Sequence, residues 1–424
     1  MNTFYEFFAG GGMARAGLGQ GWTCLLANDF SQTKAQSYVE NWGADDLIVG
    51  DVFDLDLDSV PGSADLAWGS FPCQDLSLAG SGAGLRGERS GAFWGFWDIV
   101  CGLDSQGRKP RTVVIENVYG ALTANNGRDF DQILHAATAA GYVVGAMVLD
   151  AAHFIPQSRP RLFVLCVDEM MTLPGAVHGS GPTAPWHPEA IVRAYARLPL
   201  LARQAWRWWN LPIPEQPVAR LEDLIEREPQ GVHWHSPNQT TKILAMMTER
   251  NRHKVLEAQA LRRLKVGTIY KRTRLGVQRA EVRFDGIAGC LRTPTGGSSR
   301  QTIMVVDGDA IRTRLLSPRE AARLMGLPES YRLPTRYNDA YHLAGDGVAV
   351  PVVAHIENNL LSPILAGNPR PMCLNPEYDQ DKATAVVSTK GASIALAKWT
   401  IQRSIESANT RRALASPHAS PLPG

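Results

Sequence analysis

The sequence predicts an α/β fold: a doubly wound, largely parallel sheet accompanied by a second, smaller domain. Three observations predict it. Strand and helix signals alternate from residue 1 to about residue 168, three consecutive glycines follow the first strand directly, and the alternation ends at about residue 170. A chain of 424 residues is also longer than one hydrophobic core usually serves, which favours two domains.

Short apolar runs separated by turn residues define the expected strands. Ser31 is a plausible N-cap for a helix that reaches about residue 41, and further helices are expected near 91–103 and 128–140. The strands are expected at 3–8, 23–28, 65–68, 112–115, 143–149 and 162–167. Strands that alternate with helices in this way are typical of parallel sheets.

The chain beyond residue 170 lacks this period. Prolines at 174, 182, 185 and 188 mark a linker, and 190–335 is interpreted as a second domain. Its core candidates are Trp206, Trp208, Trp209 and Trp234. The segment 371–424 is expected to be a partly disordered tail, with a possible helix near 392–407, because its end is rich in Pro, Ser and Ala.

Composition argues against a metal-binding, a secreted and a membrane-spanning protein. The formal net charge is only +2, but the span 251–300 holds twelve Lys and Arg residues against three acidic ones. The six cysteines form no CxxC pair, so no metal site is predicted, and such scattered cysteines fit a reducing compartment. The N-terminus lacks the features of a signal peptide, and no stretch of 18 uncharged apolar residues predicts a membrane span.

The first candidate site follows the first strand. Glycines at 10–12 let the backbone approach a ligand closely, although the turn is not the GxGxxG of dinucleotide sites. Asp29 ends the second strand, where a carboxylate suits ribose hydroxyls, and Asp51 ends the third apolar run, where it can accept from an adenine amino group. The pattern favours a nucleoside-carrying cofactor over a plain turn with capping acids.

The second candidate site is a cysteine beyond the strand at 65–68. Cys73 follows Pro72 at a strand end, where open α/β sheets bind ligands. The glycine-rich stretch after it suits a lid, and Arg86 is able to meet phosphates. A lone cysteine is more often inert, but this position favours a nucleophile, and none of the other five cysteines has comparable neighbours.

Two further strand ends carry charged residues. Glu116 follows the strand at 112–115, and Arg159 and Arg161 precede the strand at 162–167. Two arginines spaced by one residue in an extended chain point the same way. Taken singly, each of these charges is better explained as a solvated loop charge.

Taken together, these motifs resemble the DNA cytosine-5 methyltransferase family of the bacterial type. Pro-Cys-Gln, Glu-Asn-Val and Gln-x-Arg-x-Arg in this order are highly specific, and the resemblance covers about 1–168 and 286–362. The matching segments are Phe-Phe-Ala-Gly-Gly-Gly at 7–12, Asn-Asp at 28–29, Asp-Val at 51–52, Phe-Pro-Cys-Gln at 71–74, Glu-Asn-Val at 116–118, Gln-Ser-Arg-Pro-Arg at 157–161, Arg-Leu-Leu-Ser-Pro-Arg-Glu at 314–320, Arg-Leu-Met-Gly-Leu-Pro at 323–328 and Gly-Asp-Gly-Val at 345–348 with Pro351.

The resemblance implies a Rossmann-like catalytic domain that binds S-adenosylmethionine. It would comprise 1–180 and 340–370, with a C-terminal helix near 348–360, and 190–335 would hold the target-recognition domain and hinge. Phe8 would stack on the adenine, Asp29 would hold the ribose, and Asp51 with Val52 would hold the base. The full set of implied cofactor residues is Phe8, Ala9, Gly10, Gly11, Gly12, Asp29, Phe30, Asp51, Val52 and Asp346.

The implied reaction transfers a methyl group to C5 of a cytosine flipped out of duplex DNA. The Cys73 thiolate would add at C6, Glu116 would hydrogen-bond N3, and Arg161, with Arg159 beside it, would bind O2. The Phe71 carbonyl would accept from the cytosine amino group. The other expected substrate residues at this site are Pro72 and Gln74, beside Phe71. Arg86 in the glycine-rich stretch, and Lys271, Arg272 and Arg274 within the basic excess of 251–300, are expected on or near DNA phosphates.

Two positions depart from the family pattern. The family usually has glutamate where Asp29 stands, so the ribose contact is expected to be shorter or water-bridged. The usual Gly-Asn-Ser-Val is Gly-Asp-Gly-Val at 345–348, which puts side-chain contacts from that turn to the cofactor in doubt.

Three alternative functions remain open at this stage. They are a tRNA cytosine methyltransferase, a non-catalytic DNA-binding homologue, and a related enzyme that transfers another group. The large variable region at 170–335 favours DNA, and Cys73, Glu116 and Arg161 together favour catalysis. We expect a monomer in the cytoplasm, associated with the nucleoid when it binds double-stranded DNA, with a cognate restriction endonuclease as a possible partner.

Overall fold

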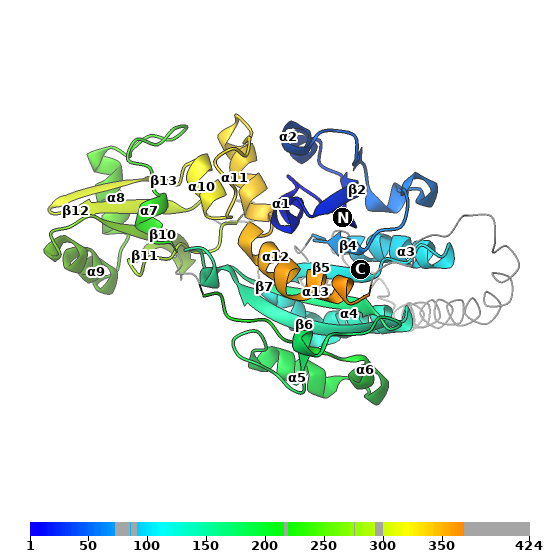
Figure 1. Ribbon diagram of the computed structural model, residues 1–424. Coiled ribbons are helices and arrows are strands. Elements are labelled where there is room, and N and C mark those ends of the chain that lie inside the picture. The colour runs from blue at the N-terminus through cyan, green and yellow to red at the C-terminus, as the bar shows by residue number, and fades with distance from the viewer. Residues whose placement is uncertain (73–84, 86–90, 216–218, 275, 293–299, 369–424) are drawn as a thin grey trace, which may run out of the picture. The chain divides into compact units, whose positions relative to one another are not determined.

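The computed structural model describes residues 1–72, 85, 91–215, 219–274, 276–292 and 300–368 (Figure 1). Met1–Asn368 form one compact unit. The expected helix near 392–407 and the rest of the tail lie outside the described residues.

A seven-stranded sheet in the order β3-β2-β1-β4-β5-β7-β6 forms the centre of this unit. β1 to β5 pair in parallel, whereas β7 is antiparallel to both β5 and β6. The strands are β1 (Asn2–Phe7), β2 (Trp22–Asp29), β3 (Leu47–Val49), β4 (Leu66–Gly69), β5 (Thr112–Val118), β6 (Tyr142–Asp150) and β7 (Pro160–Asp168). The predicted doubly wound, largely parallel sheet is confirmed.

Side chains alternate between the two faces of this sheet along each strand, so both faces carry apolar residues. Helices cover both faces. Leu66, Trp68 and Val114 belong to one core cluster, and Ala67 and Val113 belong to the other. The first cluster includes residues of α1 (Met13–Leu18), α2 (Gln32–Trp42), α11 (Tyr337–Asp346), α12 (Val350–Ile356) and α13 (Ser362–Ala366). The second includes residues of α3 (Ala92–Ser105), α4 (Arg128–Ala139) and α5 (Glu189–Arg197).

A capping residue explains where α2 begins, and a glycine explains how closely α1 packs against α12. The Ser31 hydroxyl accepts a hydrogen bond from the Lys34 amide at 3.4 Å, so the predicted N-cap of α2 is confirmed. α1 and α12 lie so close that a Cβ on Gly17 would be 2.4 Å from the Cβ of Val353. The C-terminal helix is thereby fixed against the start of the chain.

Short helical turns connect these elements. One is a π-helical segment, Glu357–Leu361, which joins α12 to α13. The 3-10 turns are Val52–Asp54, Leu57–Ser59, Tyr119–Leu122, Ala124–Gly127, Ala151–His153 and Gly175–Val177.

The segment after β7 covers the edge of the large sheet next to β6. It contains β8 (His178–Gly179), α6 (Leu200–Ala205) and β9 (Trp208–Trp209). The Arg207 amide donates to the Val144 carbonyl of β6 at 2.7 Å, and Trp206, Trp208 and Trp209 pack into the two core clusters of the large sheet. The prediction that these three residues form the core of a second domain is therefore wrong. They pack against the large sheet and cover its edge at β6, which would otherwise be exposed.

A second, four-stranded antiparallel sheet has the order β11-β10-β12-β13. Its strands are β10 (Lys265–Arg274), β11 (Val277–Arg283), β12 (Thr302–Asp307) and β13 (Ala310–Leu315), and it contacts α7 (Leu221–Leu224), α8 (Pro237–Ala245) and α9 (Glu249–Ala260). Buried side chains of α8, α9 and this sheet form a core cluster of their own, and Figure 1 shows both helices beside the sheet. Val266 and Ile303 on the same sheet belong instead to the first core cluster of the large sheet, so the small sheet packs on both.

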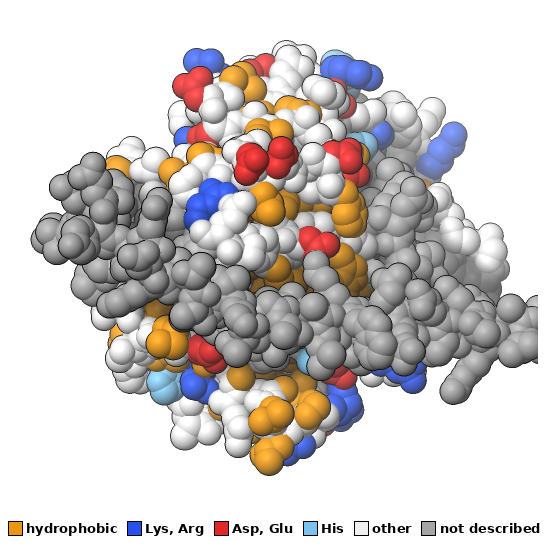
Figure 2. All heavy atoms as spheres, turned by 90° about the vertical axis from the view of Figure 1, so that its right-hand side faces the viewer, with side chains coloured by type: hydrophobic (Ala, Val, Ile, Leu, Met, Phe, Trp, Pro, Cys, Tyr) orange, Lys and Arg blue, Asp and Glu red, His pale blue; other side chains and the backbone are white. Residues whose placement is uncertain are grey.

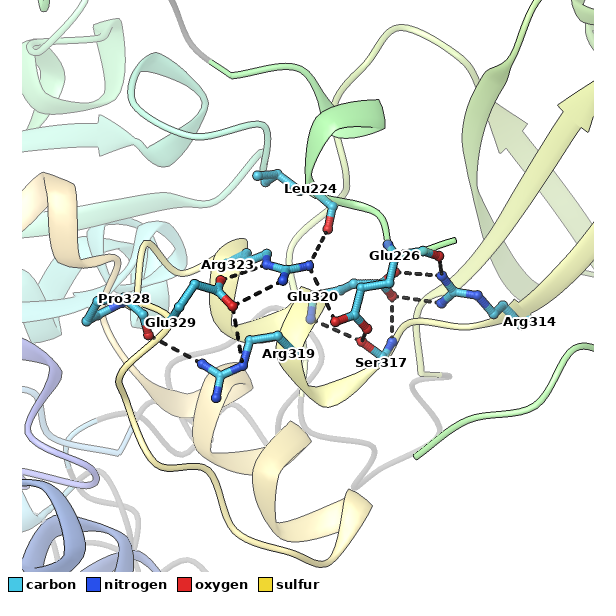
Figure 3. A network of polar contacts seen from close by, with 9 residues as sticks. All are labelled: Leu224, Glu226, Arg314, Ser317, Arg319, Glu320, Arg323, Pro328 and Glu329. Atoms are coloured by element: carbon cyan, nitrogen blue, oxygen red, sulfur yellow. Dashed lines mark hydrogen bonds and ion pairs between the residues drawn. The ribbon is translucent and has the colours of Figure 1, made fainter. Parts of the chain in front are cut away.

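A buried ion pair joins β13 to the helix α10 (Pro318–Arg323), as Figure 3 shows. Nη2 of Arg314 lies 2.6 Å from Oε1 of Glu320, and both side chains are fully buried. Glu320 also accepts from the Ser317 amide at 2.7 Å and from the Glu226 amide at 2.7 Å. One carboxylate therefore fixes the chain where it leaves the small sheet.

The stretch Tyr337–Ala366 is long and apolar enough to cross a membrane by length and composition, with a hydropathy of 1.3. Half of the window that meets this criterion is buried, and its apolar residues belong to the core cluster under α1 and α2. Burial in that core accounts for the apolar composition of this stretch.

Candidate active site

The glycine turn after β1 has the backbone conformation that its sequence predicts. Gly10 and Gly12 have φ angles of 58° and 74°, which favour glycine. A Cβ on Gly12 would be 2.3 Å from Nε1 of Trp42, and a Cβ on Gly11 would be 2.3 Å from the Tyr331 hydroxyl. Among the described residues, a Cβ on Gly10 would meet only the Lys34 side chain, at 4.0 Å, so no other described residue closes that side of the turn to a ligand.

Phe8 begins this turn in a conformation that is rare for an aromatic residue. Its φ angle is 59°, and its half-buried ring lies edge-on to Phe96 with 6.5 Å between the ring centroids. Such backbone strain is concentrated at functional sites. The strained Phe8 and the open side of Gly10 occur in the same turn.

Asp29 connects the end of β2 to the glycine turn. Its Oδ2 accepts from the Gly10 amide and its Oδ1 accepts from the Ser31 amide, each at 2.8 Å. Only 4% of the residue is exposed. Each carboxylate oxygen retains a further lone pair, so Asp29 both orders the turn and can still accept from a ribose hydroxyl.

The neighbouring strand ends present exposed aromatic and acidic residues. Phe30 is 67% exposed and Phe53 is 57% exposed, and the exposed Asp51 accepts from the Phe53 amide at 3.1 Å. Val52 is buried. Phe53 was missed by sequence reasoning, although an apolar residue two positions after a strand-end acid was an available signal. Exposed rings beside carboxylates fit the adenosine part of S-adenosylmethionine.

Asp346 forms an ion pair with Lys34, with 2.9 Å between Oδ2 and Nζ. Gly347 lies against the chain start, because a Cβ there would be 2.1 Å from the Met13 sulfur. The turn at 345–348 is thus held next to α1 and α2 despite its departure from the family pattern.

Glu116 and Arg161 face one another across β5 and β7. Nε of Arg161 lies 3.3 Å from Oε1 of Glu116, and both residues are largely buried. Burial raises the pKa of the Glu116 carboxyl, and the charges of Arg161 and Arg159 and a hydrogen bond from Ser70 only partly oppose that rise. A carboxyl with a raised pKa next to a guanidinium can donate a hydrogen bond to a ring nitrogen.

Arg159 makes its contacts with carbonyls of its own chain. Its guanidinium donates to the carbonyls of Leu291 at 3.0 Å, Gly345 at 2.8 Å and Gly347 at 2.7 Å. Only 2% of the residue is exposed. These contacts are those of a residue that positions the surrounding loops.

The predicted nucleophile Cys73 and the predicted substrate residues Gln74 and Arg86 lie outside the described residues. Their neighbours Phe71 and Pro72 are described. The Phe71 carbonyl, expected to meet the cytosine amino group, accepts from the Asn117 side chain at 3.0 Å. A carbonyl oxygen has two lone pairs, so this contact leaves one for a base.

Cys290 was expected to lie outside the large sheet and to lack neighbours comparable to those of Cys73. It does lie outside that sheet, but its sulfur is 3.4 Å from Nη1 of Arg159 and 3.9 Å from Nη2 of Arg161. Cys290 lies between β11 and β12, 131 residues along the chain from Arg159 and 129 residues from Arg161. No sequence spacing signals such a tertiary contact.

Glu6 on β1 was also missed by sequence reasoning. Only 2% of it is exposed, and burial raises its pKa to about 8 despite the nearby Arg15. Its Oε1 accepts from the Arg15 amide at 3.4 Å. An acidic residue within an apolar strand was the available signal.

The predicted DNA-binding residues lie on the hairpin of β10 and β11. Lys271 pairs with Ala280 and Arg272 with Arg279, so these consecutive residues point to opposite faces of the hairpin. Nε of Arg272 lies 3.7 Å from Oε2 of Glu281, and Arg274 ends β10. On the described part of the face turned away from the small sheet, Lys and Arg are intermixed with Asp and Glu (Figure 2).

Within the described part of the chain, no group of three or more His, Cys, Asp and Glu side chains could hold a metal ion. The ionisable side chains that the described site brings together are those of Glu116, Arg159, Arg161 and Cys290.

Solved structures share this fold. The S. pombe Dnmt2 methyltransferase matches 85% of this chain and 98% of its own, with a TM-score of 0.51 and 18% identity. The Entamoeba histolytica methyltransferase EhMeth matches 86% of this chain and 99% of its own, with a TM-score of 0.57 and 13% identity. The fold is that of methyltransferases, as predicted.

Sequence comparison extends the likeness to activity. The type II methyltransferase M.HhaI of Haemophilus parahaemolyticus is 26% identical over 361 residues, which are 84% of this chain and 93% of the relative. M.HpaII of Haemophilus parainfluenzae is 24% identical over 371 residues, 83% of this chain and 87% of that relative. The family model described as C-5 cytosine-specific DNA methylase matches residues 2–362. The chain therefore belongs to the C-5 cytosine-specific DNA methylase family, whose methyl donor is S-adenosylmethionine.

Proposed function

We propose that this protein methylates cytosine within a specific duplex DNA sequence, with Cys73 as the nucleophile and Glu116 and Arg161 as its partners. The observation that carries the proposal is the 3.3 Å contact between Arg161 and a buried Glu116 whose pKa is raised. A guanidinium and a protonated carboxyl side by side match the O2 and N3 edge of a cytosine. Cys73 enters through the Pro-Cys-Gln motif at 72–74.

Each residue has a defined task in this mechanism. The Cys73 thiolate adds to C6 of the flipped-out cytosine, and Glu116 hydrogen-bonds N3 as electron density moves onto the ring. Arg161 binds O2. When bound, S-adenosylmethionine supplies the methyl group to C5. Loss of the C5 proton then allows Cys73 to leave, which restores the aromatic ring.

The cofactor would lie over the glycine turn. Phe8 stacks on its adenine, Asp29 accepts from its ribose, and Asp51 with Val52 holds the base. Phe30 and the turn at Asp346 complete the site. The open side of Gly10 and the exposed Phe30 support this placement.

Within the predicted region 190–335, the small sheet and its helices would read the DNA sequence and include the hinge, because the start of that region packs on the large sheet. The segments 1–180 and 340–370 would form the catalytic and cofactor-binding domain. Lys271, Arg272 and Arg274 would contact phosphates. The core cluster that the small sheet forms with α8 and α9 and the basic excess of 251–300 support this division. The predicted lid with Gln74 and Arg86 lies outside the described residues.

The biological setting is inferred from the relatives. M.HhaI and M.HpaII are named type II methyltransferases, which supports a restriction-modification role with a cognate endonuclease. We propose that the protein acts as a monomer in the cytoplasm and is associated with the nucleoid when it binds DNA.

The test is methyl transfer from labelled S-adenosylmethionine to duplex DNA and, in parallel, to tRNA, followed by bisulfite sequencing of DNA from expressing cells. The proposal predicts labelled DNA and protected cytosines within one sequence. Labelled tRNA with unlabelled DNA would contradict it. Mass spectrometry of the modified nucleoside checks that the added group is methyl.

A further inference from the structure

Cys290 is held rigidly beside the arginines of β7. The chain on both sides of it pairs with the loop that precedes β7: the Ala288 amide donates to the Pro156 carbonyl at 2.7 Å, and the Leu291 amide donates to Oε1 of Gln157 at 3.1 Å. A Cβ on Gly289 would overlap the Tyr270 hydroxyl. The backbone around Cys290 therefore has little freedom, and its side chain is aimed by tertiary packing.

The sulfur of Cys290 and the carboxylate of Glu116 contact the same guanidinium. Nη2 of Arg161 lies 3.9 Å from the sulfur, while Nε of Arg161 lies 3.3 Å from Oε1 of Glu116. Nη1 of Arg159 lies 3.4 Å from the same sulfur. Cys290 thus joins both arginines, and Arg159 connects it to the carbonyls of Gly345 and Gly347.

The charges around this thiol favour its ionised form. Burial opposes ionisation, but Arg159, Arg161 and Arg292 outweigh burial and lower the pKa of Cys290. The negative charge of the Cys290 thiolate also contributes to the raised pKa of Tyr270 and to that of Tyr341. A sulfur among three arginines is a better acceptor for guanidinium N–H groups than a neutral thiol in an apolar core.

We propose that Cys290 is a positioning residue for methyl transfer, which holds the guanidinium of Arg161 in place through Nη2 while Glu116 contacts Nε. The inference rests on the proposed function of Arg161. It also gives the segment between β11 and β12 a side-chain contact with β7, in addition to its backbone contacts with the loop that precedes β7.

The test compares Cys290→Ala, Cys290→Ser and the control Cys101→Ala in the full chain. Cys101 is a partly buried cysteine on α3. The measurements are the single-turnover rate of methyl transfer and the dissociation constants for duplex DNA and for S-adenosylmethionine. We expect Cys290→Ala to lower the rate about tenfold, the effect of one lost hydrogen bond to a charged group. Both dissociation constants should stay within about twofold.

Cys290→Ser should recover most of the rate, because a hydroxyl oxygen also accepts from a guanidinium. A wild-type rate in Cys290→Ala, or a Cys290→Ser rate no better than that of alanine, would overturn the inference. If Cys290→Ala does not fold, alkylation of Cys290 by iodoacetamide is followed by peptide mass spectrometry instead. Arg161→Gln should slow that alkylation, and an unchanged alkylation rate would also overturn the inference.

Assaying Cys73→Ala in parallel distinguishes a failure of the proposed function from a failure of the inference about Cys290. If Cys73→Ala still methylates DNA, the proposed function fails. If Cys73→Ala is inactive while Cys290→Ala is unchanged, only the inference about Cys290 fails.

Discussion

Arg161 on β7 reaches diagonally across the sheet to Glu116 on β5. Arg161 is in register with Val118, two positions beyond Glu116, so the two side chains share one face of antiparallel neighbouring strands. Their contact of 3.3 Å lies at the strand ends, and it depends on β7 running opposite to β5. The reversed strand is thus what brings the Gln-x-Arg-x-Arg motif to the Glu-Asn-Val motif.

Replacing Glu116 by Gln should slow methyl transfer and remove one limb of its pH dependence. Burial raises the pKa of Glu116, so its protonated form persists above the usual range of a carboxyl and is lost as the pH rises through the raised value. The wild-type rate should fall with that loss, whereas Glu116→Gln has no proton to lose. General acid catalysis is worth about 10²- to 10⁴-fold, which sets the expected reduction.

Single-turnover rates from about pH 6 to about pH 10 measure both effects, because this range lies above the ordinary carboxyl pKa of about 4.3 and brackets the ordinary thiol pKa of about 8.5. A Glu116→Gln variant that retains the wild-type descending limb would show that another group causes it.

Replacing Asp29 by Ala should weaken cofactor binding by about 1–3 kcal/mol, the cost of a lost charged hydrogen-bond partner. The loss has two sources, because the carboxylate also orders the amides of Gly10 and Ser31. Titration calorimetry with S-adenosylmethionine measures the affinity. Asp54→Ala is a matched exposed control and should bind normally. Equal affinities in both variants would refute the assignment of Asp29.

Neutralising Lys271, Arg272 and Arg274 together should flatten the salt dependence of DNA binding. Each lost phosphate contact removes about 0.9 from the slope of log K against log salt. Lys271 and Arg272 point to opposite faces of the hairpin, so we expect a change smaller than three contacts would give. Arg193→Gln on α5, whose guanidinium pairs with Glu189, is the control. Identical slopes in all proteins would place the phosphate contacts elsewhere.

Breaking the buried pair of Arg314 and Glu320 should destabilise the protein by about 3–5 kcal/mol, because one buried charge would lose its partner. Glu320→Gln tests this in urea unfolding. Arg193→Gln is the control, since both partners of its pair with Glu189 are exposed (70% and 75%) and such surface pairs contribute about 0–1 kcal/mol. Equal unfolding free energies in the two variants would contradict a structural role for the buried pair.

Much of the large sheet was predictable because its signals are local. Apolar runs placed β1 and β2, and Ser31 marked the start of α2. Glu116 and Arg161 were predictable from motifs at strand ends. Their contact was not, because it depends on the antiparallel direction of β7, and the length of that strand was underestimated.

The failures concern residues whose placement depends on distant parts of the chain. Trp206 and Trp208 pack on β6 because an uncovered sheet edge needs partners, which periodicity within their own segment does not show. Cys290 meets Arg161 across 129 residues. Glu6 is buried where α1 and the loop before α11 meet over β1, since Arg15 and Tyr331 are among its neighbours.

Trapping the reaction intermediate tests the central claim most directly. Duplex DNA with 5-fluorocytosine at the target position should form a covalent complex, because fluorine cannot leave C5 as the proton does. Proteolysis followed by mass spectrometry then identifies the peptide that carries the base. The account predicts the peptide containing Cys73. A base on the peptide containing Cys290, which lies 3.9 Å from Arg161, or the absence of any covalent complex, would contradict it.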